Sequence, residues 1–352
     1  FVCMLCAGTM ALAQNESAIR YEIENDRMKS ALTMTESAMA ADPMNGKLNY
    51  LLGKIQMMAG NSAAASDAFT KGKDKTNHGW MNLVGLGWIA LNNGDAAGSQ
   101  VQFDAAVKLA GPKNAEVCYL IADAYFRAVK QDLDKSLAWV DKALAIQPAH
   151  LDALLLKGDI YLNKPDGGGK ALTAYEDAET RFKDSPAPEV RIARLYMNAR
   201  NYPLAMDYIN KSLAKDANYS PAHKIKGDYT FNLKKYQEAR TNYEKALSLS
   251  DSTDQLLTQY LYACFLAKDY NTTYELSSKL KGSAINPFVL NRAEAYSLFE
   301  TGKVPESLES IQRLFNSGTP ERLIRQDYLY YGKILAKSKK DSVAIGYFEK
   351  AY

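Results

Sequence analysis

The sequence predicts an all-α fold built from a tandem array of helix pairs, an α-solenoid. A related segment recurs nine times, at intervals of 34 to 37 residues. The eighth position of nearly every segment holds a small residue, and prolines are confined to places that a helix tolerates. No alternation of apolar and polar residues with hairpin turns, as strands would require, competes with this pattern. The segments begin near residues 46, 80, 115, 151, 186, 220, 254, 288 and 325.

Each segment is expected to begin with a helix that packs closely at its eighth residue. A side chain as small as that of alanine is needed where two helices cross so closely that a larger substituent would force them apart. Only the seventh segment departs from this rule, with Leu261. The small residues are Gly53, Gly87, Ala122, Gly158, Ala193, Gly227, Ala295 and Gly332.

A second helix is expected in the latter half of each segment. A small residue near position 20 is followed one helical turn later, on the same face, by a large apolar residue. Ser277 alone breaks that apolar series. Its members are Phe69, Phe103, Val140, Tyr175, Ile209, Tyr243, Ile311 and Phe348.

The 11 prolines indicate the same helix boundaries. Proline costs about 3 kcal/mol inside a helix but is tolerated in a first turn or a loop. Pro188, Pro203 and Pro305 fall in expected first turns, and Pro165 falls in the loop of the fourth segment. The others fall at junctions between segments.

The sixth segment carries Gly227, Tyr236, Ala239, Tyr243 and Ala246 where the tetratricopeptide repeat family has such residues. The chain from residue 46 to residue 352 resembles that family. The resemblance implies a right-handed superhelix of about nine helix-turn-helix units. The ninth unit is incomplete at residue 352, so we expect more protein after it. Residues 14–45 are expected to form capping helices, a partial repeat that covers the open N-terminal end of the array.

Residues 1–13 are uncharged, mostly apolar and end in Ala11-Leu12-Ala13. This pattern is typical of the apolar region and cleavage site of a secretory signal peptide whose basic start is missing. We expect cleavage after Ala13 and export to the periplasm. No later stretch approaches eighteen apolar residues, so the sequence predicts no membrane span.

The resemblance implies that the outward positions of the first helices line a concave groove that binds a protein or peptide. Trp88, Phe126 and Phe299 are the strongest candidate anchors, because aromatic side chains favour binding hot spots. At any single position the alternative is burial against the neighbouring repeat. The candidate groove residues are Tyr50, Met57, Val84, Trp88, Tyr119, Asp123, Phe126, Arg127, Asp159, Arg194, Lys224, Phe231, Tyr262, Phe265, Arg292, Tyr296 and Phe299.

Acidic residues gather in the third and fourth repeats of the expected groove. Glu116, Asp123, Asp152 and Asp159 all occupy outward first-helix positions. Opposite charge on a partner increases its association rate. The sequence therefore predicts a partner segment with a basic stretch at this place.

Composition and motifs indicate no catalysis, cofactor, metal or small-molecule substrate. A net charge of +3 argues against a nucleic-acid partner. The glycine run 167–169 lacks the spacing of a phosphate loop. The three histidines lie in separate repeats without ligand partners, and Cys118 and Cys264 occupy inward positions. No nucleophile, base and orienting group come together.

The sequence therefore predicts a non-catalytic protein-binding scaffold. Proteins of this fold type in bacterial envelopes suggest a role in envelope assembly or secretion, an analogy of fold alone. The alternative is a regulatory or localising arm of a larger envelope enzyme, sensor or peptidoglycan-binding protein whose other domain follows residue 352.

Overall fold

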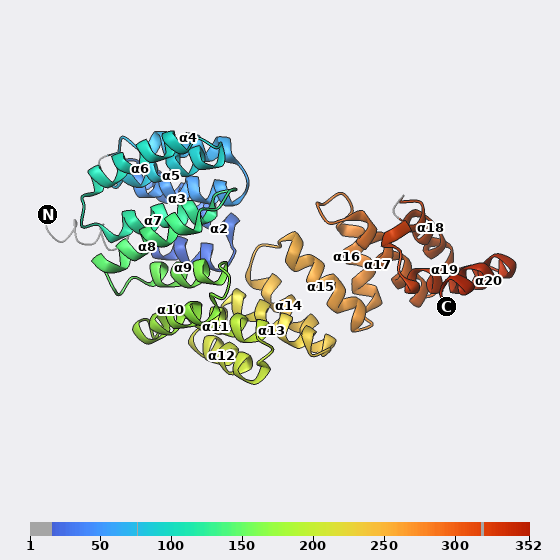
Figure 1. The fold of residues 1–352 in the computed structure, drawn as a ribbon. Coiled ribbons are helices and arrows are strands. Elements are labelled where there is room, and N and C mark those ends of the chain that lie inside the picture. Colours follow the sequence, from blue (N-terminus) through green and yellow to red (C-terminus); the bar gives the residue numbers. More distant parts are fainter. Residues whose placement is uncertain (1–15, 76, 318–319) are drawn as a thin grey trace. The chain divides into compact units, whose positions relative to one another are not determined.

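The computed structural model describes residues 16–75, 77–317 and 320–352. Helices are its only extended regular elements (Figure 1), so the all-α prediction is confirmed for this part of the chain. No helix in these ranges has both the length and the apolar character to cross a membrane. The expected signal peptide, residues 1–13, lies outside the described residues.

The chain forms two compact units. Unit 1 comprises Phe1–Ala222 with Leu249–Asp251, and unit 2 comprises His223–Ser248 with Ser252–Tyr352. In unit 1 a helical segment, residues 16–24, precedes α2 (Met28–Ala41). There follow the pairs α3 (Gly46–Met58) and α4 (Ser62–Gly72), α5 (Gly79–Asn92) and α6 (Ala96–Ala110), α7 (Ala115–Arg127) and α8 (Leu133–Ile146), α9 (Leu151–Leu162) and α10 (Gly168–Arg181), and α11 (Ala187–Asn198) and α12 (Tyr202–Lys215).

The same pairing continues through the rest of the chain. Helix α13 begins in unit 1, and each first helix starts within one residue of a repeat start read from the sequence. The remaining elements are α13 (Ser220–Asn232) and α14 (Tyr236–Leu249), α15 (Asp254–Leu266) and α16 (Tyr270–Lys279), α17 (Pro287–Glu300) and α18 (Val304–Phe315), the 3₁₀ turn Pro320–Arg322, and α19 (Arg325–Lys337) and α20 (Asp341–Lys350).

Local sequence sets where the helices begin and end. The Asn114 side chain accepts the N–H of Val117 and caps α7, and Asp95 caps α6 in the same way through Gly98. Between the two helices of most pairs, one residue takes a left-handed conformation, which glycine adopts without steric cost. Gly60 and Gly94 occupy that position in the first two pairs, with φ of +81° and +78°.

The glycines at the eighth position face aromatic rings of the second helix. A Cβ added at Gly53 would lie 2.2 Å from the Phe69 ring, and one at Gly227 would lie 2.5 Å from the Tyr243 ring. Both rings are buried. The expectation that this position must be small is therefore confirmed, and the cause is a ring that lies directly on the glycine.

Candidate partner-binding groove

The groove predicted for unit 1 runs over the first helices α3, α5, α7 and α9. Their fifth positions carry Tyr50, Val84 and Tyr119, and their ninth positions include Trp88 and Asp123. All five residues are buried, and Trp88 lies in the main apolar cluster of the unit. These five side chains are therefore buried, which was the alternative to an exposed groove position.

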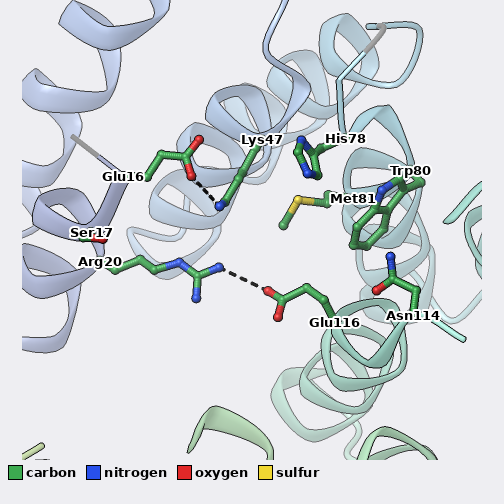
Figure 2. Close-up of a pocket in the computed structure, with 9 residues that line it drawn as sticks. All are labelled: Glu16, Ser17, Arg20, Lys47, His78, Trp80, Met81, Asn114 and Glu116. Carbon is green, nitrogen blue, oxygen red and sulfur yellow. Dashed lines mark hydrogen bonds and ion pairs between the residues drawn. The ribbon is translucent and has the colours of Figure 1, made fainter. Parts of the chain in front are cut away.

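The helical segment 16–24 lies against the same face of unit 1 (Figure 2). Glu16 forms an ion pair with Lys47 in the first turn of α3. The Arg20 guanidinium donates to Glu116 Oε1 of α7 at 3.1 Å and to Asp152 Oδ2 of α9 at 3.4 Å. The segment thus joins the first turns of three inner helices.

One apolar side chain fixes the other side of the segment. Ile19 is fully buried in a cluster with Ala31 and Ala38 of α2 and with Leu48 and Leu51 of α3. Residues 16–24 therefore contribute both to the packing of α2 on α3 and to the polar contacts across the inner helices.

Glu116 is the centre of a charged cluster. Its Oε1 accepts a hydrogen bond from the Arg20 guanidinium, and His150 Nε2 lies 3.0 Å from its Oε2. The His150 ring also packs on Tyr119, with 5.1 Å between centroids, and its Nδ1 accepts the N–H of Ala153 at the start of α9. Burial alone would raise the pKa of Glu116, but His150 and Arg20 outweigh it and lower the pKa to about 2.

Asp123 of α7 forms a second charged cluster deeper in the groove. It accepts from Lys54 of α3 at 3.1 Å and from Arg127, one turn further along α7, at 2.6 Å. Burial would raise the pKa of Asp123, but these two cations outweigh it and keep the pKa below its ordinary value. The charge of the buried Asp123 carboxylate is thus balanced by two cations, and the Lys54 contact links α7 to α3.

Asp159 of α9 repeats this arrangement one repeat further. The Tyr175 hydroxyl donates to Asp159 Oδ1 at 2.7 Å, and Arg191 Nε of α11 lies 3.2 Å from the same atom. The four acidic residues of the expected groove thus lie in three groups, and each group takes its cations from this chain.

A pocket of about 480 Å³ opens where the segment meets α3, α5 and α7 (Figure 2). Its charged lining residues are already paired, Glu16 with Lys47 and Arg20 with Glu116. The other lining residues are Ser17, His78, Trp80, Met81 and Asn114.

The remaining candidates of unit 1 keep contact with solvent. Met57 and Phe126 are partly buried against the main apolar cluster. Arg127 and Arg194 are exposed. Arg194 is thus the candidate in unit 1 that is both charged and available without displacement of another side chain.

The candidates of unit 2 also divide into buried and exposed positions. Tyr262 is exposed, whereas Phe231 and Phe265 are partly buried and meet Tyr236 and Tyr270 edge-on. Lys224 is partly exposed.

Arg292 and Tyr296 of α17 converge on Asp327 of α19. Arg292 Nε and Nη2 donate to the two Asp327 oxygens at 2.8 and 2.7 Å, and the Tyr296 hydroxyl donates to Oδ1 at 2.6 Å. Tyr296 is also stacked on Tyr330 at 3.8 Å, and Phe299 meets the Tyr330 ring edge-on. These three predicted groove residues form the joint between two repeats.

A family model of the tetratricopeptide repeat matches residues 84–150, and a second one matches residues 225–253. These two stretches of the chain are thus similar to the tetratricopeptide repeat. No curated protein matches it.

Several solved structures are similar at low sequence identity. A chain of the APC/C hetero-tetramer Cut9-Hcn1 is 15% identical with a TM-score of 0.54, over 96% of this chain and 55% of that one. The present chain thus spans about half the length of that protein. Pseudomonas aeruginosa PilF is 16% identical (TM-score 0.48), over 62% of this chain and 97% of that one. YrrB, described as a tetratricopeptide protein with an unusual peptide-binding site, is 17% identical (0.45), over 51% and 91%.

The repeat pattern alone did not reveal the residues that fill the groove between the tetratricopeptide repeats of unit 1. Arg20, Lys54 and Arg191 were not among the candidates, and Arg20 lies outside the array from which the candidates were drawn. The signal that could have indicated Arg20 is its place beside Ile19 and Ile23 in an amphipathic helix facing an acidic groove.

Proposed function

We propose that the chain is a non-catalytic scaffold that binds a helical segment of another protein on the inner helices of unit 1. The observation that supports the proposal is the seating of residues 16–24 on this face, with Arg20 bound by two carboxylates from successive repeats. A surface that accommodates one amphipathic helix has the width and charge to accept another.

Site-specific photocrosslinking tests this proposal in the full chain. A photoreactive residue at Arg194, exposed on inner helix α11, should give adducts with a partner protein. The matched control is Val101, which is 64% exposed on the second helix α6. Equal labelling at the two positions, or labelling at Val101 alone, would contradict binding on the inner face.

We further propose that the protein acts in the bacterial envelope, in assembly or secretion. The support is the apolar stretch before Ala11-Leu12-Ala13. Sequencing the N-terminus of protein recovered from the cell envelope should give Gln14 as the first residue. A protein recovered only from the cytoplasm with residues 1–13 retained would contradict export.

A further inference from the structure

The segment 16–24 makes contacts that resemble those of a bound ligand. Its polar contacts run along unit 1 beyond α9: after Arg20, the Tyr21 hydroxyl donates to Asp216 at 2.9 Å, and in the turn just after the segment Asn25 Oδ1 accepts the N–H of Ser220 at 2.9 Å. All these partners lie far along the sequence. Besides packing on α2 and α3, the segment therefore makes contacts with distant repeats, as a helix laid across the array would.

The contacts that hold the segment are individually weak. Ile19 is its one fully buried side chain. Arg20 and its two acidic partners are 37%, 28% and 31% exposed, so water screens these ion pairs in part. A helix of two turns is also unstable when isolated. Release of the segment therefore costs mainly the exposure of Ile19 and the loss of partly screened ion pairs.

Helix α2 is held by contacts of its own as well as by Ile19 of the segment. Its buried residues are Ala31, Thr35 and Ala38, and its N-terminus is held by Leu249, the last residue of α14, and by Asp251. Asp251 Oδ2 accepts the N–H of Lys29 at 2.8 Å, and Arg27 Nε donates to the Leu249 carbonyl at 2.5 Å. The turn at residues 25–27, where Asp26 has φ of +57°, is the point about which the segment would move.

We propose that residues 16–24 are a resident ligand of the unit 1 groove, which a partner helix of the same chemistry displaces. That partner presents an arginine to Glu116 and Asp152 and an apolar residue one position earlier, where Ile19 now lies. This inference rests on the proposed function and adds to it both the chemistry of the partner and its regulation by the chain's own N-terminal segment.

A labelled peptide of residues 16–27 tests the exchange by fluorescence anisotropy. In the unaltered chain the tethered segment competes at a high effective concentration, so the peptide should bind poorly. Arg20→Gln in the full chain weakens the tethered copy and leaves the acceptor carboxylates intact. This variant should bind the unaltered peptide at least about ten-fold more tightly.

Two controls locate the binding. The peptide carrying Arg20→Gln should not bind the opened chain, and a chain with Glu116→Gln and Asp152→Asn should bind neither peptide. Asp67→Asn, which removes an exposed carboxylate from α4, should behave like the unaltered chain. Equal peptide affinity in the unaltered and Arg20→Gln chains would overturn the inference.

Trypsin digestion provides an independent measurement. Cleavage after Arg20 should be at least about ten-fold faster in the Glu116→Gln, Asp152→Asn chain, because the guanidinium is released from the groove. Unchanged protection would overturn the inference. A dimer in light scattering that dissociates on Arg20→Gln would also overturn it, since the segment would then be exchanged between two copies.

The two proposals fail in different ways. If the opened chain binds its own peptide but Arg194 crosslinks no protein, the proposed function alone fails. If Arg194 crosslinks a protein and neither Arg20→Gln nor added peptide changes the yield, the resident-ligand inference alone fails.

Discussion

At the scale of single residues, the contact between a glycine and an aromatic ring determines how closely two helices of a repeat approach. Gly227→Ala places a methyl group 2.5 Å from the Tyr243 ring, which is buried between the same helices. The ring must move in a packed core, so we expect a loss of about 1–3 kcal/mol in the free energy of unfolding. Denaturant unfolding of the two chains measures this loss.

Gly346→Ala in α20 is the matched control. No atom lies within 4 Å of an added Cβ at this helical position. Alanine favours a helix interior over glycine, so this variant should gain about 0.5–1 kcal/mol. Similar losses at both glycines would show that the ring contact is not the cause.

Glu116 makes the stability of unit 1 depend on pH. Its pKa is lowered from 4.5 to about 2 in the folded chain. The stabilising contribution of Glu116 is therefore complete above about pH 5, and it is lost as the pH falls toward 2. We expect Glu116→Gln to cost about 2–3 kcal/mol at pH 7 and much less near pH 3.

Thermal unfolding of the Glu116→Gln chain across this pH range measures the effect. Glu36→Gln, at an exposed position of α2, is the control and should follow the unaltered chain at every pH. A stability difference for Glu116→Gln that stays constant from pH 7 to pH 3 would contradict the assignment to this carboxylate.

At the scale of elements, Asp327 joins α17 to α19. The carboxylate is fully buried, accepts from Arg292 and Tyr296, and also accepts the N–H of Ile324 at the start of α19. Asp327→Ala leaves a partly buried guanidinium without its partner. We expect this substitution to lower the free energy of unfolding of unit 2 by about 3–5 kcal/mol. Denaturant unfolding measures the loss. A loss under about 1 kcal/mol would show that the joint depends on the aromatic stack instead.

At the scale of the whole molecule, the chain consists of two compact units, each with its own apolar clusters. In solenoids, stability is the sum of local terms between neighbouring repeats. We therefore expect two calorimetric transitions. Trp88→Ala, which empties a core position of unit 1, should lower one of them, and Asp327→Ala should lower the other.

A single transition that both variants shift equally would contradict this independence. Tyr262→Ala is the control, because its side chain is 39% exposed and its removal should leave both transitions nearly unchanged.

The helix pairs and their boundaries could be predicted from the sequence because their causes are local. A glycine under a ring, a proline in a first turn and a capping asparagine each act within one repeat, so the pattern recurs at a fixed interval. The acidic cluster around Glu116 was equally visible, since its members occupy equivalent positions of successive repeats.

The content of the groove was decided only by tertiary structure. Arg20 lies 96 residues from Glu116 and 132 from Asp152, and no periodicity relates them. Whether Trp88 is an exposed anchor or a core residue likewise depends on how tightly neighbouring repeats wind, and that curvature is a sum of small rotations that no single repeat encodes. The sequence by itself determined a stack of helix pairs with an acidic inner face, whereas folding in three dimensions decided that the chain's own N-terminal helix lies on it.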